Sequence, residues 1–161
     1  MRTSEWCGQR GFAFLWVLLA VAMLGLLVAS AADVVSVQQR RDRELQLLSI
    51  GREFRAALRQ YHDCPTCDGG SQYPSALVDL LLDPRHGAEG HRYLRKIYVD
   101  PVTGVPDWGI VRDGSAIVGI YSKSMEKPLM QHGFVADEMS FNAAASYQAW
   151  IFAAQPIAER R

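Results

Sequence analysis

The sequence lacks an excess of charge of either sign, since 17 lysines and arginines balance 17 aspartates and glutamates. A nucleic-acid-binding surface depends on clustered basic residues, so this balance gives no electrostatic case for nucleic acid. The chain also lacks a phosphate-binding loop, a Gly-x-Ser-x-Gly motif and a His-Glu-x-x-His motif, and its four histidines are scattered. These absences favour a protein that is not an enzyme.

Charged side chains are also absent from residues 12–32, where Ser30 is the one conventional polar residue. A helix of that length spans about 30 Å, the thickness of the hydrocarbon core of a bilayer. The run therefore predicts a transmembrane helix rather than a buried core helix, which in so small a domain normally keeps a polar stripe. The roughly 130 residues beyond it are enough for one hydrophobic core.

A cleaved secretory signal peptide is the alternative, with Ala29-Ser30-Ala31 as its small-residue cleavage site. The apolar run is long for a signal peptide, so we favour the membrane anchor. Arg10 borders the run on its N-terminal side and Asp33 borders it on the other. This arrangement favours a cytoplasmic N-terminus and an external C-terminal part.

Proline is absent from residues 33–61, and Gly51 is the only glycine there. Apolar residues recur in this segment at spacings of three and four, which predicts a helix with one buried face. The residues of that face are Leu47, Ile50, Phe54, Leu58 and Tyr61. The charged residues expected to avoid it are Arg41, Glu44, Arg52, Glu53, Arg55 and Arg59. Residues 12–61 are then one helix of roughly 50 residues, about 75 Å long.

The helix is expected to end at Cys64-Pro65, before the glycines that follow. Two cysteines so close together in an oxidising compartment predict a local disulfide between Cys64 and Cys67. A thiol-exchange site, a zinc site and free thiols are the alternatives. Thiol-exchange motifs normally begin a helix that follows a strand, and zinc needs a second pair of ligands.

Residues 76–82 predict a short helix capped by the Ser75 hydroxyl and stopped at Asp83-Pro84. A surface loop is expected over residues 85–92. The runs 108–112 and 116–121 flank Asp113-Gly114, which predicts a β-hairpin. A third strand is expected over residues 147–153, and the amphipathic end of the long helix would cover the sheet. Residues 122–146 predict a long loop with little order and a candidate contact surface.

Arg10-Gly11-Phe12, followed at once by the apolar run, resembles the processing signal of type IV prepilins and type II secretion pseudopilins. The resemblance implies that a prepilin peptidase removes residues 1–11, cutting between Gly11 and Phe12, and methylates Phe12. Family members usually carry a glutamate four residues after that phenylalanine, where this chain has Trp16. In a filament the glutamate is thought to neutralise the N-terminal ammonium of a neighbour, so its absence favours a minor subunit.

Residues 73–75, 93–97 and 100–104 also resemble segments that follow the long helix in major pseudopilins. The resemblance implies an α+β fold, in which a long N-terminal helix with a transmembrane half and an amphipathic half packs on a small antiparallel β-sheet. It implies a structural subunit of a type II secretion-like pseudopilus, single-pass in the inner membrane, with residues 33–161 as its periplasmic head. The implied partners are other pseudopilin subunits, prepilin peptidase, an inner-membrane assembly platform and the lipid bilayer. A type IV minor pilin, and a single-pass periplasmic protein with a Cys-x-x-Cys thiol-exchange site, are the alternatives.

Related pseudopilins bind calcium in a loop beside their sheet, which makes Asp100, Asp107 and Asp113 the calcium candidates of this chain. Calcium takes about six to eight oxygen ligands, and these three residues do not supply a full set. Ordinary turn aspartates are therefore the alternative.

Overall fold

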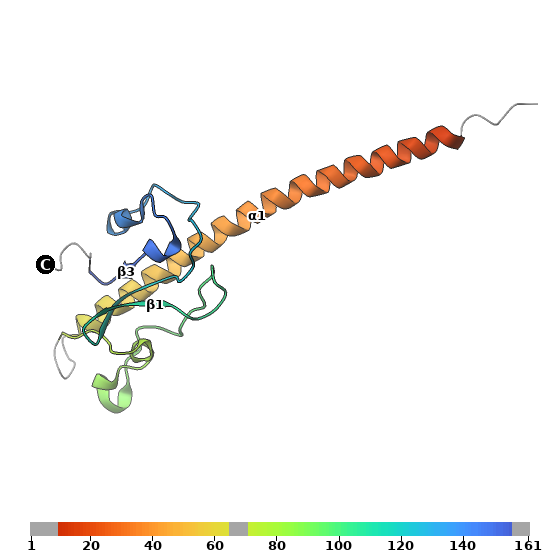
Figure 1. Ribbon diagram of the computed structural model, residues 1–161. Helices are drawn as coiled ribbons and strands as arrows, with labels where there is room; N and C mark the ends of the chain where they lie inside the picture. Colours follow the sequence, from red (N-terminus) through yellow and green to blue (C-terminus); the bar gives the residue numbers. More distant parts are fainter. Residues whose placement is uncertain (1–9, 65–70, 156–161) are drawn as a thin grey trace, which may run out of the picture. The chain divides into compact units, whose positions relative to one another are not determined.

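The computed structural model describes residues 10–64 and 71–155, without the side chains of residues 10, 11, 27–34 and 87–89. Its elements, with η for a 3₁₀ helix, are α1 (Arg10–His62), η1 (Leu77–Leu80), η2 (Pro84–Glu89), β1 (Gly109–Asp113), β2 (Ala116–Tyr121), η3 (Ala136–Phe141), η4 (Tyr147–Ala149) and β3 (Phe152–Ala153). The strands form one antiparallel sheet in the order β1-β2-β3, so the predicted α+β class is confirmed (Figure 1). The chain divides into two compact units, with the boundary after Arg40.

Helix α1 runs for 53 residues, so the prediction of one helix through the apolar run and the amphipathic segment is confirmed. The helix contains no proline. A proline inside it would lack the backbone N–H that donates to the carbonyl four residues earlier. Arg59 lies in its last turn, where a cationic side chain interacts favourably with the exposed carbonyls. Among the residues that the structure describes, which leave out the side chains of residues 27–34, no helix combines the length and the apolar character needed to cross a membrane. The transmembrane half of α1 therefore stays a prediction.

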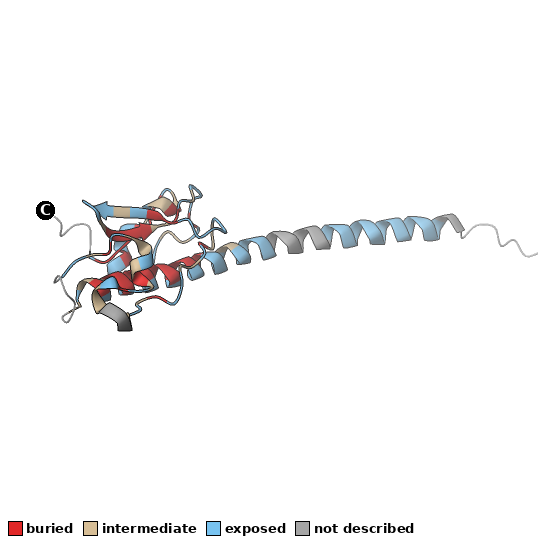
Figure 2. Ribbon diagram, turned by 90° about the horizontal axis from the view of Figure 1, so that it is seen from below, coloured by how far each residue is buried: buried red, intermediate tan, exposed pale blue. Residues whose placement is uncertain are grey.

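The predicted apolar face of α1 is confirmed. All five of its residues are buried: Leu47, Ile50, Phe54, Leu58 and Tyr61. They share one core with Ile117 and Ile120 of β2 and with Phe152 of β3. Figure 2 shows the buried residues gathered on the last turns of α1 and on the sheet beside them. The helix therefore covers the sheet, as the sequence predicts.

Strands β1 and β2 form the predicted antiparallel hairpin, with Ile110 paired to Ile120. Gly114 and Ser115 connect the two strands. The φ angle of Gly114 is +59°, in the left-handed region that glycine adopts without steric cost. A two-residue connection that starts at such a glycine matches the right-handed twist of the strands.

The third strand is much shorter than predicted. Only Phe152 and Ala153 pair with β2, whereas Tyr147–Ala149 form the 3₁₀ helix η4. Tyr147 and Trp150 are both buried. A separation of three places two side chains on one face of a helical turn but on opposite faces of a strand. Burial of both side chains therefore favours the turn over the longer strand.

Residues 122–146 are not the loop of little order that the sequence predicts. They contain η3, and Phe134, Glu138 and Phe141 are buried. The rings of Phe134 and Phe141 lie 5.3 and 5.5 Å from the ring of Trp150. The buried positions recur at spacings of four and three, but one of them is a glutamate. A glutamate is normally a surface residue, and this hid the pattern.

The predicted short helix over residues 76–82 is the 3₁₀ helix η1. The carboxylate of Asp79 accepts hydrogen bonds from the backbone amides of Ser75 and Ala76. The Ser75 hydroxyl, predicted as the cap, instead donates to the same carboxylate. The cap is therefore supplied from inside the helix rather than from the residue before it.

Candidate functional site

The N-terminal part of α1 carries the predicted processing point. Gly11 and Phe12 both lie within the helix, which begins at Arg10. The Phe12 side chain is 66% exposed, and its ring lies edge-on to the Trp16 ring at a centroid distance of 6.3 Å. The residue that stands in place of the usual glutamate therefore lies beside the residue that would follow the cleavage site. Residues 1–9 of the predicted leader are outside the described residues.

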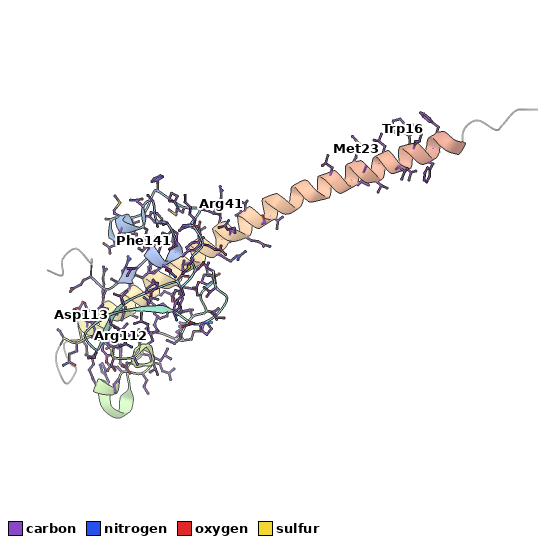
Figure 3. The ribbon with its side chains drawn as sticks, viewed as in Figure 1. Trp16, Met23, Arg41, Arg112, Asp113 and Phe141 are labelled. Carbon is purple, nitrogen blue, oxygen red and sulfur yellow. The ribbon has the colours of Figure 1, made fainter. Side chains whose placement is uncertain are left out.

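An apolar surface follows along the same helix. Eleven large hydrophobic side chains between residues 12 and 26 are 51–71% exposed: Phe12, Phe14, Leu15, Trp16, Val17, Leu18, Leu19, Val21, Met23, Leu24 and Leu26. Figure 3 shows Trp16 and Met23 projecting outward from the helix. Removing one such side chain fully from water is worth roughly 1.5–3 kcal/mol. A continuous apolar surface of this extent marks a contact with a membrane or with another protein.

Glu44 lies on the buried side of α1, so the expectation that it avoids the core face is wrong. One carboxylate oxygen accepts from the Leu129 amide and from the Tyr147 hydroxyl at 2.8 Å, and the other accepts from the Met130 amide at 3.2 Å. Hydrogen bonds to an ionised carboxylate are stronger than those between neutral groups. Glu44 thereby ties α1 to the segment that precedes η3. The sequence carries no local signal for this contact, because its donors lie 85 to 103 residues away.

Arg55 is the second exception on α1, since it is buried and not on the exposed side as expected. Its Nη1 lies 3.6 Å from Oε1 of Glu138, a fully buried residue of η3. Burial lowers the pKa of Arg55, and the attraction of Glu138 opposes this effect. Arg52 donates to both oxygens of Glu138, at 2.7 and 2.8 Å, and this bidentate hydrogen bond raises the pKa of Arg52.

Asp83 is a fully buried carboxylate that the sequence did not single out. It accepts from the Arg85 amide at 2.9 Å, from the Arg85 guanidinium at 2.9 to 3.2 Å and from the Tyr93 hydroxyl at 3.1 Å. Burial by itself would raise the pKa of Asp83, but the hydrogen bonds from Arg85 and Tyr93 outweigh it and hold the pKa at about 2.

The segment after Asp83 is consequently ordered. Residues Pro84–Glu89 form η2 where the sequence predicts a surface loop, and the Asp83 carboxylate caps the Arg85 amide, the first N–H of this helix. Arg85 also donates to the Tyr61 carbonyl at 2.7 Å, near the end of α1. Asp83-Pro84 both stops the preceding helix and starts the next one, because Asp followed by Pro is also a typical start of a helical turn.

Cys64 is disulfide-bonded, and its predicted partner Cys67 lies outside the described residues. The Cys64 sulfur lies 3.7 Å from Nε2 of His86, whose ring is 5.0 Å from that of His91. A cleft of about 410 Å³ is lined in part by these three residues. The side chains of His62 and His86 are each 24% exposed. In the described part of the chain, no group of three or more His, Cys, Asp or Glu residues is arranged to hold a metal ion.

The three calcium candidates do not share one site in the described part of the chain. Asp100 is fully buried and accepts from the Ser122 hydroxyl at 2.6 Å and the Val102 amide at 2.8 Å. Asp107 is exposed and pairs with Lys123 at 2.6 Å. Asp113 is exposed at the end of β1, next to the turn of the hairpin (Figure 3). Asp100 thus stabilises the turn over residues 100–105, while the other two are surface residues.

No protein-family model, curated protein or solved structure matches this chain. Any function must therefore follow from the surface and the contacts of the chain itself. The exposed apolar surface of α1 is the most extensive such feature among the described residues.

Proposed function

We propose that this chain is a pilin-like structural subunit of a type II secretion-like pseudopilus, and not an enzyme. Residues 1–11 serve as a leader that a prepilin peptidase removes between Gly11 and Phe12, with methylation of Phe12. The apolar part of α1 then holds the protein in the inner membrane as a single pass. Residues 33–161 form the head in the periplasm, where other pseudopilin subunits contact it.

The observation that carries this proposal is the change of character along one unbroken helix. Between residues 12 and 26, α1 exposes large apolar side chains, whereas Leu47, Phe54 and Leu58 of the same helix are buried in an α+β core. A soluble domain rarely exposes so much continuous apolar surface. Lipid, or the apolar helices of neighbouring subunits, would remove that surface from water. A subunit that moves from a bilayer into a filament needs such a helix, with one apolar part for lipid or neighbouring helices and one part packed in its own core.

Assembly exchanges one apolar environment for another, so packing and charge pairing decide whether a subunit leaves the bilayer. After processing, the ammonium of Phe12 would need a carboxylate from a neighbour once it is buried. Trp16 lies against Phe12 and supplies no such carboxylate. A subunit with few neighbours tolerates this absence better than one repeated along a filament. Trp16 therefore supports a minor role for this subunit. An inner-membrane assembly platform would transfer the subunit from the bilayer to the pseudopilus.

Processing is the direct test. The full chain is produced with and without a prepilin peptidase, and its N-terminus is determined by sequencing and intact mass. We expect a mature chain that begins at N-methylated Phe12 only when the peptidase is present. Gly11→Leu should block the cleavage. Gly25→Leu is the matched control, because nothing lies within 4 Å of the position that a Cβ would take there.

Two results would contradict the proposal. One is a mature chain that begins at any other residue, in particular after Ala31, where a signal peptidase would cut. The other is equal processing of the Gly11→Leu and Gly25→Leu variants, since the cut would then not depend on the glycine before Phe12.

A single-pass envelope protein active in thiol exchange is the second candidate, favoured by the 3.7 Å approach of His86 to the Cys64 sulfur. A positively charged imidazole beside a free cysteine would increase the fraction of that cysteine present as thiolate, the form that acts as the nucleophile. Cys64→Ser should abolish reduction of a disulfide substrate if this candidate is right and should leave processing unchanged if the chain is a pilin-like subunit. A type IV minor pilin would have the same leader cleavage, Phe12 methylation and membrane anchor. The neighbouring genes would distinguish it from a secretion pseudopilin.

A further inference from the structure

A cleft of about 550 Å³ lies where α1 meets the start of η3. Three arginines of α1 line it at spacings of three and four, Arg52, Arg55 and Arg59, so they share one face of the helix. Asp137 and Glu138 line the opposite side. The cleft thus holds three guanidinium groups and two carboxylates, which leaves one positive charge in excess.

The excess charge resides on Arg55. Arg52 uses its Nε and Nη2 on both oxygens of Glu138, and Arg59 pairs with Asp137 at 3.0 Å. Arg55 reaches Glu138 only at 3.6 Å, beyond hydrogen-bond distance, and its Nε is buried without a hydrogen-bond partner. The two carboxylates of the cleft are therefore committed to the outer two arginines.

A buried guanidinium with an unsatisfied donor is unfavourable and rare in folded proteins. The Arg55 side chain is only 7% exposed, and burial lowers its pKa, with the like charges of Arg52 and Arg59 acting in the same direction. The guanidinium carbon also lies 5.7 Å from the centroid of the Phe152 ring. An anion in the cleft would compensate the charge that the chain itself leaves without a close partner.

We propose that this cleft binds the carboxylate of an aspartate or glutamate side chain presented by a protein partner. A single carboxylate matches the excess of one positive charge, whereas a phosphate group carries about −1.5 to −2 at neutral pH and would exceed it. A planar carboxylate also matches the fork of donors on a guanidinium. Ala56, Val135 and Ala136 supply apolar walls for the methylene stem of an acidic side chain. This carboxylate site does not depend on whether a prepilin peptidase removes residues 1–11, so it can be tested separately from the proposed function.

The test is a titration of the full chain in a non-ionic detergent, followed by the NMR signals of the arginine Nε–H groups. The probe is N-acetylglutamic acid N-methylamide, which carries one side-chain carboxylate between two peptide groups. We expect saturable shifts of the Arg55 signal at millimolar probe. In Arg55→Gln, where binding is followed on the Nε–H signals of Arg52 and Arg59, the affinity should fall about ten-fold or more, the loss typical of a hydrogen bond to a charged group. Arg92→Gln, which removes the same charge from an exposed residue outside the cleft, should change binding less than about two-fold.

Acetate and inorganic phosphate serve as comparison probes. Binding of the glutamate probe that is tighter than that of either one supports the proposal. Tighter binding of phosphate, or equal binding of acetate, would overturn the assignment to a protein side chain. A linear, unsaturated shift of the Arg55 signal would overturn the site itself. If Arg55→Gln fails to fold, the wild-type titration and the Arg92→Gln control still decide between these outcomes.

Discussion

Replacing Asp83 by asparagine should destabilise the compact unit of residues 41–161 at neutral pH and remove one acid-sensitive contribution to its stability. The carboxylate is fully buried and is held by Arg85 and Tyr93, and its pKa falls from 3.8 to about 2 on folding. Each unit of pKa shift corresponds to about 1.4 kcal/mol, so ionised Asp83 contributes roughly 2–3 kcal/mol. Because the folded pKa is the lower one, this stability is fully present above the unfolded value and is lost as the pH falls from about 5 toward 2.

Urea unfolding of the full chain in a non-ionic detergent, followed by tryptophan fluorescence between pH 7 and pH 2, measures this contribution. The free energy of unfolding of Asp83→Asn should lie about 2–3 kcal/mol below that of the wild type at pH 7, and the gap should close near pH 2. Asp107→Asn is the matched control, because Asp107 is an exposed residue in a surface ion pair with Lys123. That variant should differ from the wild type by less than about 1 kcal/mol. A gap for Asp83→Asn that stays constant across the pH range would refute the reasoning.

Two further substitutions test the packing and the polar contacts of α1 by the same unfolding measurement. A Cβ at Gly51 would lie 2.3 Å from the Phe152 ring, so Gly51→Ala should lose about 1–3 kcal/mol, whereas Gly25→Ala, with open space around it, should lose nothing; equal stability of the two variants would contradict this. Glu44→Gln places an amide donor against buried backbone donors and should cost about 2–4 kcal/mol. Tyr147→Phe removes one partner of the same carboxylate and should cost less; a larger loss for Tyr147→Phe would show that Glu44 is not the centre of this contact.

The elements that the sequence predicted well are those with local signals. Helix α1 has an apolar run, no proline and a stripe at helical spacing, and each of these properties is read within a few turns. The hairpin follows from strand-forming residues on either side of Gly114. These features depend on backbone geometry and on the alternation of side chains, which distant residues hardly change.

The candidate sites depended on contacts that no local pattern records. Glu44 and Arg55 were expected on the exposed side of α1, because charged residues seldom lose contact with water. They are buried because residues 126–138 bring amide donors and Glu138 against the helix. The sequence predicts Asp83 only as the end of a helix before proline, yet Arg85 and Tyr93 make it the centre of a buried hydrogen-bond network.

By itself the sequence determined a long helix with an apolar beginning, an amphipathic end and a hairpin beside it, because helical and strand periodicities are properties of neighbouring residues. Only the tertiary structure decided which charges are buried, where the third strand ends and which arginine lacks a close partner. Glu138 and Glu44 meet partners that lie 86 and 103 residues away in the sequence, and even the partners of Asp83, 2 and 10 residues away, are brought to it by the folded chain. The free energy of burying a charge is set by the partners that such contacts supply.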